Sequence, residues 1–361
     1  MLLRFSRICT SLLLLLFSAN IFANPAEKSD NSKEFDVNEM IMHHIKDSHE
    51  FHIMDINGHA VSFPLPIILW TDNGLVTFLS SEFNHDDSGK VIVNRKNQAF
   101  IKYHEKIFYA AQTGEKNIIY DSNGVVLNKK PLDLSITKMV FSMFISMVLL
   151  VLIFVATART YSQSRNGEPT GLGKFTEPLV LFIKDEVALP MIGEKNYQKY
   201  MPFLLTLFFF IWINNVMGLI PFFPFSANLS GNIAFTFVLA AITFIITTLV
   251  ANKDYWKHIF WMPGIPVPMK LFLAPIEFLG IFIKPISLMI RLFANISAGH
   301  IIILSLISLI FIFKSLWLAP ASLFFSVFIS LIEVLVVAIQ AYIFTMLSAL
   351  YIGSAIEEHE H

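Results

Sequence analysis

The sequence predicts an all-α polytopic membrane protein with about five transmembrane helices, the last two long and tilted, and one interfacial helix. A small exported N-terminal domain with β-hairpins precedes these helices. Hydrophobic residues fill 55% of the 361 positions and charged residues only 15%, whereas a soluble protein carries about 25% charged residues. From about residue 138 onward, the apolar residues gather into blocks that reach the ~20 residues needed to cross a bilayer. The net charge of −1 argues against a polyanionic partner such as nucleic acid.

Residues 1–23 have the pattern of a secretory signal peptide. Arg4 and Arg7 form a basic start, a short apolar run follows, and Ala23 is a small residue at the cleavage side. An uncleaved anchor is the alternative. Export places the next residues in the periplasm. The only cysteine, Cys9, lies in this segment, so disulfides and cysteine-ligated metals are excluded for the mature chain.

Residues 24–135 predict a small periplasmic domain. Short β-branched and aromatic runs alternate with turn signals, a pattern typical of antiparallel hairpins. Residues 43–52 are polar and predict a helix. The turn signals stand at Asp55–Gly58, Thr71–Gly74, Asp87–Gly89 and Asp121–Gly124.

Residues 136–361 predict the membrane-embedded domain. Basic residues follow the first and third spans, so the positive-inside rule places those loops in the cytoplasm. Five crossings then leave the C-terminus in the cytoplasm as well. Residues 175–192 mix charged and apolar positions, which favours a helix along the membrane surface. The spans are expected at about 137–158, 200–221, 233–251, 271–313 and 321–355.

The last two apolar stretches are longer than the ~20 residues of an upright helix. Each stretch therefore contains a re-entrant break or forms one steeply tilted helix. A single crossing for each stretch gives five spans, and we favour two long tilted helices.

Four ionisable residues lie deep in these two stretches: Glu277, Arg291, His300 and Glu333. Because charge at membrane depth is costly, such residues are by default candidates for function. Lys284 lies there too, but a lysine can extend its amine toward the interface. Glu277, Lys284 and Arg291 are spaced by seven residues and share one helix face.

Antiparallel packing of the two long helices would place Arg291 between two polar zones. His300 and Glu333 would lie toward the periplasm, whereas Glu277 lies on the cytoplasmic side. A permanent cation between two polar zones is what an ion path with a switch needs. The alternative is structural, because an Arg291–Glu333 or a Lys284–Glu277 pair would neutralise buried charges.

The run from Lys284 to His300 reads KPISLMIRLFANISAGH. It resembles the signature helix of the ATP synthase a subunit family, K-P-x-S-L-x-x-R-L-F-x-N-x-x-A-G followed by a protonatable residue. Other segments resemble the same family: NVMGLIP at 215–221, SAN at 226–228, QAYIF at 340–344 and EEH at 357–359. The resemblance covers the chain from about residue 175 to its end, and it assigns no function to residues 24–135.

The resemblance implies a proton-translocating stator subunit of the Fo sector of a bacterial F-type ATP synthase. A ring of c subunits, each with one membrane-embedded carboxyl, turns against such a subunit, and two offset aqueous half-channels load and unload those carboxyls. The other implied partners are the b-subunit peripheral stalk, the remainder of the complex and the lipid of the inner membrane. The chain by itself is then not an enzyme, and no cofactor or metal is implied. The choice of H⁺ or Na⁺ is set largely by c-ring ligands and stays open.

The resemblance also assigns roles to single residues. Arg291 is the gate that faces the c-ring, and an arginine keeps its proton even in a poor dielectric, so lysine is not expected to replace it. Gln340 is expected to form a hydrogen bond beside Arg291, and Asn295, one turn beyond Arg291 on the same face, adds to the polar lining. The periplasmic proton path is assigned to His300, Glu333, Asn215 and Asn228, and the cytoplasmic path to Glu277 and Ser287.

The chain departs from the family pattern in one place. Some bacterial relatives have a carboxylate at the position of His300 and a histidine at that of Glu333, so the pair is exchanged here. One imidazole and one carboxyl still face each other, and a histidine titrates near neutrality. The exchange leaves the order of proton transfer between the two side chains open.

Two other classes of function compete with this interpretation. A secondary transporter or channel with a periplasmic sensing domain would explain the buried charges, but it predicts internal repeats, and the sequence has none. A membrane-anchored periplasmic metal-binding protein is suggested by the N-terminal histidines. Only His49 and His52 have a spacing that shares a helix face. The histidines concerned are His43, His44, His49, His52 and His59.

Overall fold

The computed structural model describes residues 46–56, 59–111, 117–121, 125–163, 170–220, 225, 227–262, 265–313 and 317–357. The predicted signal peptide, Cys9, His43 and His44 lie outside these residues.

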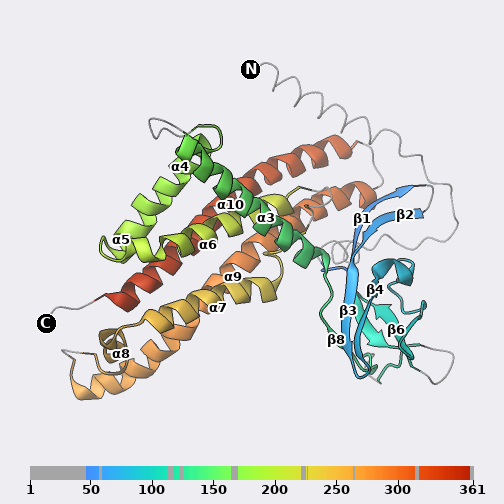
Figure 1. Cartoon of the computed structure of the whole chain (residues 1–361), viewed down its shortest axis with the longest axis horizontal. Helices are drawn as coiled ribbons and strands as arrows, with labels where there is room; N and C mark the ends of the chain where they lie inside the picture. Colours follow the sequence, from blue (N-terminus) through green and yellow to red (C-terminus); the bar gives the residue numbers. More distant parts are fainter. Residues whose placement is uncertain are drawn as a thin grey trace. The chain divides into compact units, whose positions relative to one another are not determined.

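The N-terminal region forms three small antiparallel sheets, as predicted. Their strand orders are β1-β2, β4-β3-β8 and β5-β6-β7 (Figure 1). The predicted turn at Thr71–Gly74 joins β3 to β4, and Gly74 has a φ of +89°, a conformation that favours glycine. The strands are β1 (Glu50–Ile56), β2 (His59–Pro64), β3 (Pro66–Thr71), β4 (Gly74–Leu79), β5 (Val93–Arg95), β6 (Gln98–Tyr103), β7 (Lys106–Tyr109) and β8 (Leu132–Asp133), with the short helix η1 (Ser80–Phe83) after β4.

The helix predicted for residues 43–52 is wrong over the part that the structure describes. Residues 46–49 are not helical, and β1 begins at Glu50. Pairing with β2 places Phe51 opposite Phe63 and leaves Phe51 only 2% exposed. The burial gained by pairing overrides a weak helical preference. The argument that His49 and His52 share a helix face therefore fails.

His49 instead belongs to a buried network of charges. Its Nε2 lies 3.2 Å from Asp133 Oδ2 and its Nδ1 lies 3.7 Å from Glu105 Oε2. Lys102 Nζ, also buried, lies 3.7 Å from Glu105 Oε1. Burial alone lowers the pKa of His49, but the two carboxylates outweigh burial and raise that pKa to about 9. Burial raises the pKa of Glu105, but His49 and Lys102 outweigh it and lower that pKa to about 2.

These shifts predict how the stability of the N-terminal domain depends on pH. The contribution of His49 is fully present below pH 6.5, its ordinary pKa, and is lost as pH rises through about 9. It amounts to ~3 kcal/mol at most. Protection of the domain from proteolysis should therefore fall between these pH values, and the fall should be absent in His49→Gln. His85→Gln is the control, because His85 is 40% exposed in its pair with Glu50. An unchanged pH profile in His49→Gln would contradict the prediction.

Within the described residues, five helices are long and apolar enough to cross a membrane, namely α3, α6, α7, α9 and α10, which confirms the predicted spans. Their outer faces expose large apolar side chains such as Leu331 and Leu335, as expected of faces that meet lipid. The helices are α3 (Lys138–Gln163), α4 (Gly173–Phe182), α5 (Leu189–Ile192), α6 (Tyr197–Gly218), α7 (Ile233–Val250), α8 (Lys253–Phe260), α9 (Val267–Phe313) and α10 (Ala319–Ile356), and a π-helical turn, η2 (Ile183–Ala188), joins α4 to α5.

The two long apolar stretches each form one continuous helix, so no re-entrant break interrupts them. Helix α9 has 47 residues and extends over ~70 Å, more than twice the ~30 Å of the hydrocarbon core. Helix α10 has 38 residues. The two run antiparallel: Asn295, His300 and Leu306 of α9 meet Gln340, Glu333 and Ser322 of α10, respectively.

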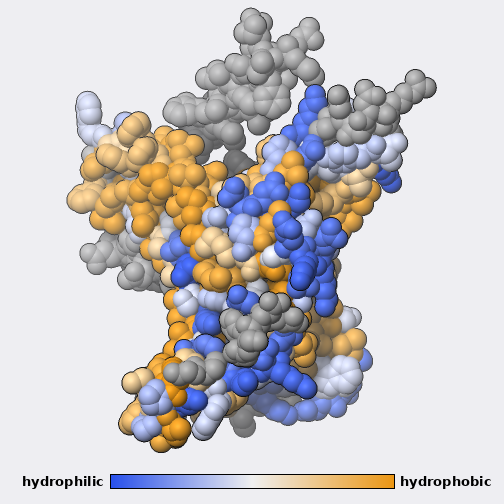
Figure 2. Space-filling model, turned by 90° about the vertical axis from the view of Figure 1, so that its left-hand side faces the viewer, coloured by the Kyte–Doolittle hydropathy of each residue, from blue (hydrophilic) through white to orange (hydrophobic). Residues whose placement is uncertain are grey.

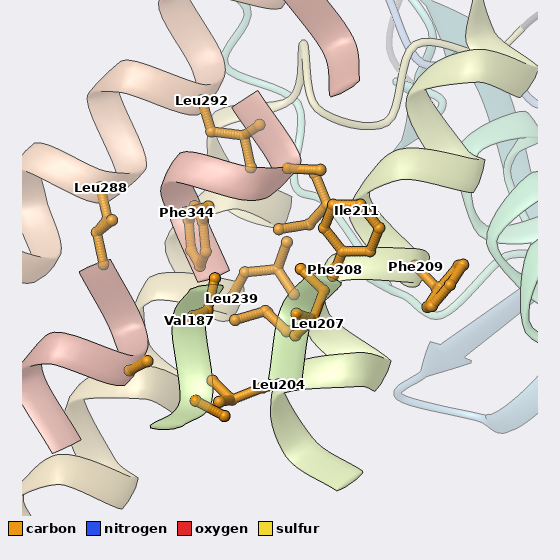
Figure 3. Close-up of a cluster of buried hydrophobic side chains, with 14 of the residues drawn as sticks. Val187, Leu204, Leu207, Phe208, Phe209, Ile211, Leu239, Leu288, Leu292 and Phe344 are labelled. Atoms are coloured by element: carbon orange, nitrogen blue, oxygen red, sulfur yellow. The ribbon is translucent and has the colours of Figure 1, made fainter. Parts of the chain in front are cut away.

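A compact apolar cluster fixes these two helices against their neighbours (Figure 3). Helix α9 contributes Leu288 and Leu292, and α10 contributes Phe344, all at most 1% exposed. Side chains of α6, α7 and η2 complete the cluster. Within a bilayer such contacts act through close packing rather than through exclusion of water. The cluster sets the depth and rotation of the polar residues that α9 and α10 carry.

Candidate functional site

Arg291 lies on α9 between Leu288 and Leu292 of the packed cluster, and its side chain is half-buried. Among the described residues no carboxylate lies within ion-pair distance of its guanidinium. In the same part of the chain, the only ion pair that involves α9 or α10 is that of His300 with Glu333. Neither the Arg291–Glu333 nor the Lys284–Glu277 pair of the structural alternative is formed. A cation without an ion-pair partner in the described part of its own chain is suited to an anion supplied by another molecule.

One turn beyond Arg291, a hydrogen bond joins the two long helices. Asn295 Nδ2 donates to Gln340 Oε1 at 2.8 Å. Gln340 is 2% exposed, and its Nε2 has no partner among the described residues. The partner of Gln340 is therefore Asn295 rather than Arg291. Within the described residues, the N–H donors of the Gln340 amide therefore remain available for a hydrogen bond to a second group beside Arg291.

His300 and Glu333 face each other across α9 and α10. His300 Nε2 lies 4.0 Å from Glu333 Oε1, and Glu333 is 4% exposed. Neither carboxyl oxygen of Glu333 has a hydrogen-bond partner among the described residues. The carboxyl lies against Gly299, where a Cβ atom would come 2.7 Å from Glu333 Cδ. Glycine at 299 thus makes the close approach of the carboxyl to α9 possible.

The predicted asparagines lie at the C-terminal end of α6 and in the segment that follows it. Asn215 is 3% exposed, and neither polar atom of its amide group has a hydrogen-bond partner among the described residues. Asn228 accepts a hydrogen bond from the backbone N–H of Gly231 at 2.8 Å, and its Nδ2 is unpaired within the described part of the chain. Gly218 packs closely on Ala227 and Asn228. Buried polar atoms without protein partners are positions that ordered water normally fills.

Sequence reasoning missed several buried polar side chains of the same kind. Ser142, Asn214 and Ser230 are fully buried, and each has a polar atom without a partner in the described residues. No sequence signal separates them from ordinary serines and asparagines of membrane helices, because only packing decides whether such a side chain is buried and unpaired.

Glu277 and Ser287, both predicted for one path, are not brought together. Glu277 is half-buried and lines a cavity of about 210 Å³ with residues of α8 and α10. Ser287 is exposed on the surface of α9 and does not line this cavity.

Comparison with known families covers both parts of the chain. The model of a domain of unknown function matches residues 40–134. The family model of the ATP synthase A chain matches residues 140–353, which is more than half of the chain. The chain belongs to the ATP synthase A chain family. This membership decides against the secondary-transporter interpretation.

Individual members of the A chain family support the same assignment. The ATP synthase subunit a of Chloroherpeton thalassium is 43% identical over 235 residues, covering 63% of this chain and 69% of the relative. That of Chlorobium phaeobacteroides (strain DSM 266) is 44% identical over 236 residues, covering 63% and 67%. That of Anaeromyxobacter dehalogenans (strain 2CP-C) is 36% identical over 288 residues, covering 77% and 73%. All of the predicted site residues lie within the stretch that the A chain model matches.

Proposed function

We propose that this chain translocates protons as the a subunit of the Fo sector of an F-type ATP synthase. In this proposal two offset half-channels load and unload the carboxyls of a c-ring, and Arg291 is the electrostatic gate between them. The observation that carries the proposal is the unpaired, half-buried guanidinium of Arg291 between two separate polar regions of the α9–α10 pair.

The gate follows from the charge of Arg291. A deprotonated c-ring carboxylate is attracted to the guanidinium, which has no competing carboxylate in its own described surroundings. The same positive charge repels a proton that would pass directly between the two regions. Arginine retains its charge there, so it acts as a barrier and an anchor, and it does not carry protons itself.

The inlet is assigned to the polar groups on the His300 side of Arg291. The unpaired buried atoms of Asn215, Asn228 and Glu333 favour a line of water that ends at the His300–Glu333 pair. Either member of the pair is able to hand a proton onward. The outlet is assigned to Glu277 and its cavity.

This assignment carries an orientation and a set of partners. The N-terminal domain would lie in the periplasm and the C-terminus in the cytoplasm, in the inner membrane of a bacterium. The c-ring and the b-subunit stalk are the proposed partners, with the remainder of the complex supplying nucleotide chemistry. The chain alone would then not be an enzyme.

Gly299→Ala tests the position of the Glu333 carboxyl. The added Cβ would lie 2.7 Å from Glu333 Cδ and 3.2 Å from Cγ, so the carboxyl has to leave its present position opposite His300. A displacement of this size is expected to slow proton transfer by about 10-fold to 100-fold. ATP-driven proton pumping into inverted membrane vesicles measures the rate. Gly280→Ala on the same helix is the matched control, because nothing lies within 4 Å of its Cβ position. Equal rates for the two variants would contradict the assigned inlet.

The proposed function itself is tested by Arg291→Ala in the same vesicles. Coupled pumping should be lost while ATP hydrolysis by the detached catalytic sector continues. Wild-type coupled pumping in this variant would refute the central role of Arg291.

A further inference from the structure

The end of the helical bundle that carries the C-terminal end of α10 contains the cavity assigned above to the outlet, and two of the side chains that line it, His258 and Glu357, have no role so far. The cavity has a volume of about 210 Å³ and lies between α8, α9 and α10. In Figure 2, which views this end of the molecule, hydrophilic residues gather across the middle and hydrophobic residues flank them. The polar side chains that line the cavity are Tyr255, His258, Glu277, Lys284, Ser354 and Glu357.

A smaller cavity of about 20 Å³ adjoins the first one on its inner side. Tyr255, Ile281 and Lys284 line both cavities. Tyr351, Pro285, Phe244 and three threonines of α7 complete the lining of the inner cavity. Its volume suffices for about one water molecule, whereas the outer cavity has room for several.

The wall shared by the two cavities offers polar groups to water. Residue 285 is proline, so the carbonyl of Ile281 receives no helical N–H donor. Lys284 Nζ lies 5.6 Å from the centre of the Tyr351 ring. Burial raises the pKa of Tyr255, and the charge of Glu277 adds to that shift, which reflects how near the carboxylate lies. Tyr255 thus stands between the two cavities with a hydroxyl that remains protonated.

The outer cavity opens to solvent at the end of α10. Glu277 and His258 are half-buried, whereas Ser354 and Glu357 are exposed, so exposure increases toward Glu357. Asn252 holds α8 against this end: its backbone N–H donates to Ala355 O and its Nδ2 to Ile356 O, each at 2.9 Å. Because these carbonyls have no partner within the helix, Asn252 caps α10 and holds the start of α8, the helix that carries His258, against this end of the bundle.

We propose that His258 and Glu357, at the mouth of this outlet cavity, transfer protons between Glu277 and bulk water. The inference rests on the function proposed above. A proton that reaches the Glu277 carboxylate passes, directly or through cavity water, to the imidazole of His258 or the carboxylate of Glu357, and then to solvent water. Each group returns to its starting protonation state after one transfer. In the pumping direction the same groups collect protons from the cytoplasm.

The test uses the complete complex in inverted membrane vesicles, with a His258→Ala/Glu357→Gln double variant. The initial rate of ATP-driven pumping is expected to fall about tenfold, less than for a positioned acid in a closed site, because water partly replaces the lost groups. Millimolar imidazole on the outer face should restore most of the rate. Asp254→Asn, on the same helix but outside the cavity lining, is the control and should pump normally.

The outcomes separate this inference from the proposed function. Wild-type pumping by the double variant overturns the inference, and so does a loss of rate that imidazole does not restore, since that indicates a structural role. Arg291→Ala is measured in parallel, and only normal pumping by that variant counts against the proposed function. If the double variant does not assemble, the two single variants decide by the same criteria.

Discussion

Lysine at position 291 is expected to abolish coupled proton pumping although it preserves the positive charge. Arg291 is half-buried beside Leu288 and Leu292, and a lysine ammonium in such a place is readily deprotonated. It also lacks the planar fork of donors that holds a carboxylate from two sides. We expect pumping to fall at least about 100-fold, equivalent to ~2.7 kcal/mol in the barrier.

The passive leak of protons through the membrane distinguishes the barrier function of Arg291 from its attraction of c-ring carboxylates. After removal of the catalytic sector, vesicles with Arg291→Ala should conduct protons passively faster than vesicles with Arg291→Lys, because alanine removes the barrier charge entirely. Lys270→Arg is a useful control for a change between the same residue types on the same helix, because Lys270 lines neither outlet cavity. Pumping by Arg291→Lys at a substantial fraction of the wild-type rate would show that charge alone suffices and that the gate as proposed is wrong.

Glu333→Gln is expected to have the second largest effect. The amide keeps the shape of the side chain against Gly299 but cannot take up and release a proton. Both carboxyl oxygens are buried without a hydrogen-bond partner in the described structure, so the substitution removes a costly buried acid. Pumping should fall by about 10²-fold, a typical contribution of a positioned proton-transfer group. The thermal stability of the purified complex should be unchanged or higher.

A lower pumping rate without a loss of thermal stability distinguishes a role of Glu333 in proton transport from a role in folding. Glu186→Gln, on the π-helical turn η2 and exposed, is the control and should change neither quantity. A loss of stability in parallel with the loss of pumping would indicate that Glu333 is structural. His300→Gln in the same vesicles then reports whether the imidazole is needed at all.

Sequence reasoning succeeded where a single physical signal dominates. The five spans follow from apolar runs that are long enough to cross a bilayer, and their ends agree with the structure to within a few residues. Antiparallel packing of the two helices also predicted that Glu333 and His300 lie on the same side of Arg291, and the family resemblance added that they face each other. The helix expected at 43–52 failed because a strand partner, Phe63 opposite Phe51, cannot be recognised from local composition.

The candidate site also has properties that the sequence predicts and properties that depend on packing. The sequence alone identified Arg291, His300 and Glu333 as candidates, since the cost of placing charge in lipid does not depend on the details of packing. Packing alone decides which polar atoms lack a partner, so Asn214 and Ser230 were not found and Ser287 proved to be exposed. The continuity of α9 across Pro275 and Pro285 was predicted from the number of crossings, not from the residues of the helix itself.

The sequence by itself therefore determined the fold class, the spans and the family, because these depend on composition, length and a long motif. Only the tertiary structure decided that Gln340 pairs with Asn295, that Gly299 makes room for a carboxyl, and that His258 and Glu357 share a cavity with Glu277. Those relations depend on the register between α8, α9 and α10. That register is set by close packing around Leu288 and Phe344 and by the capping of α10 by Asn252, interactions between residues far apart in the chain.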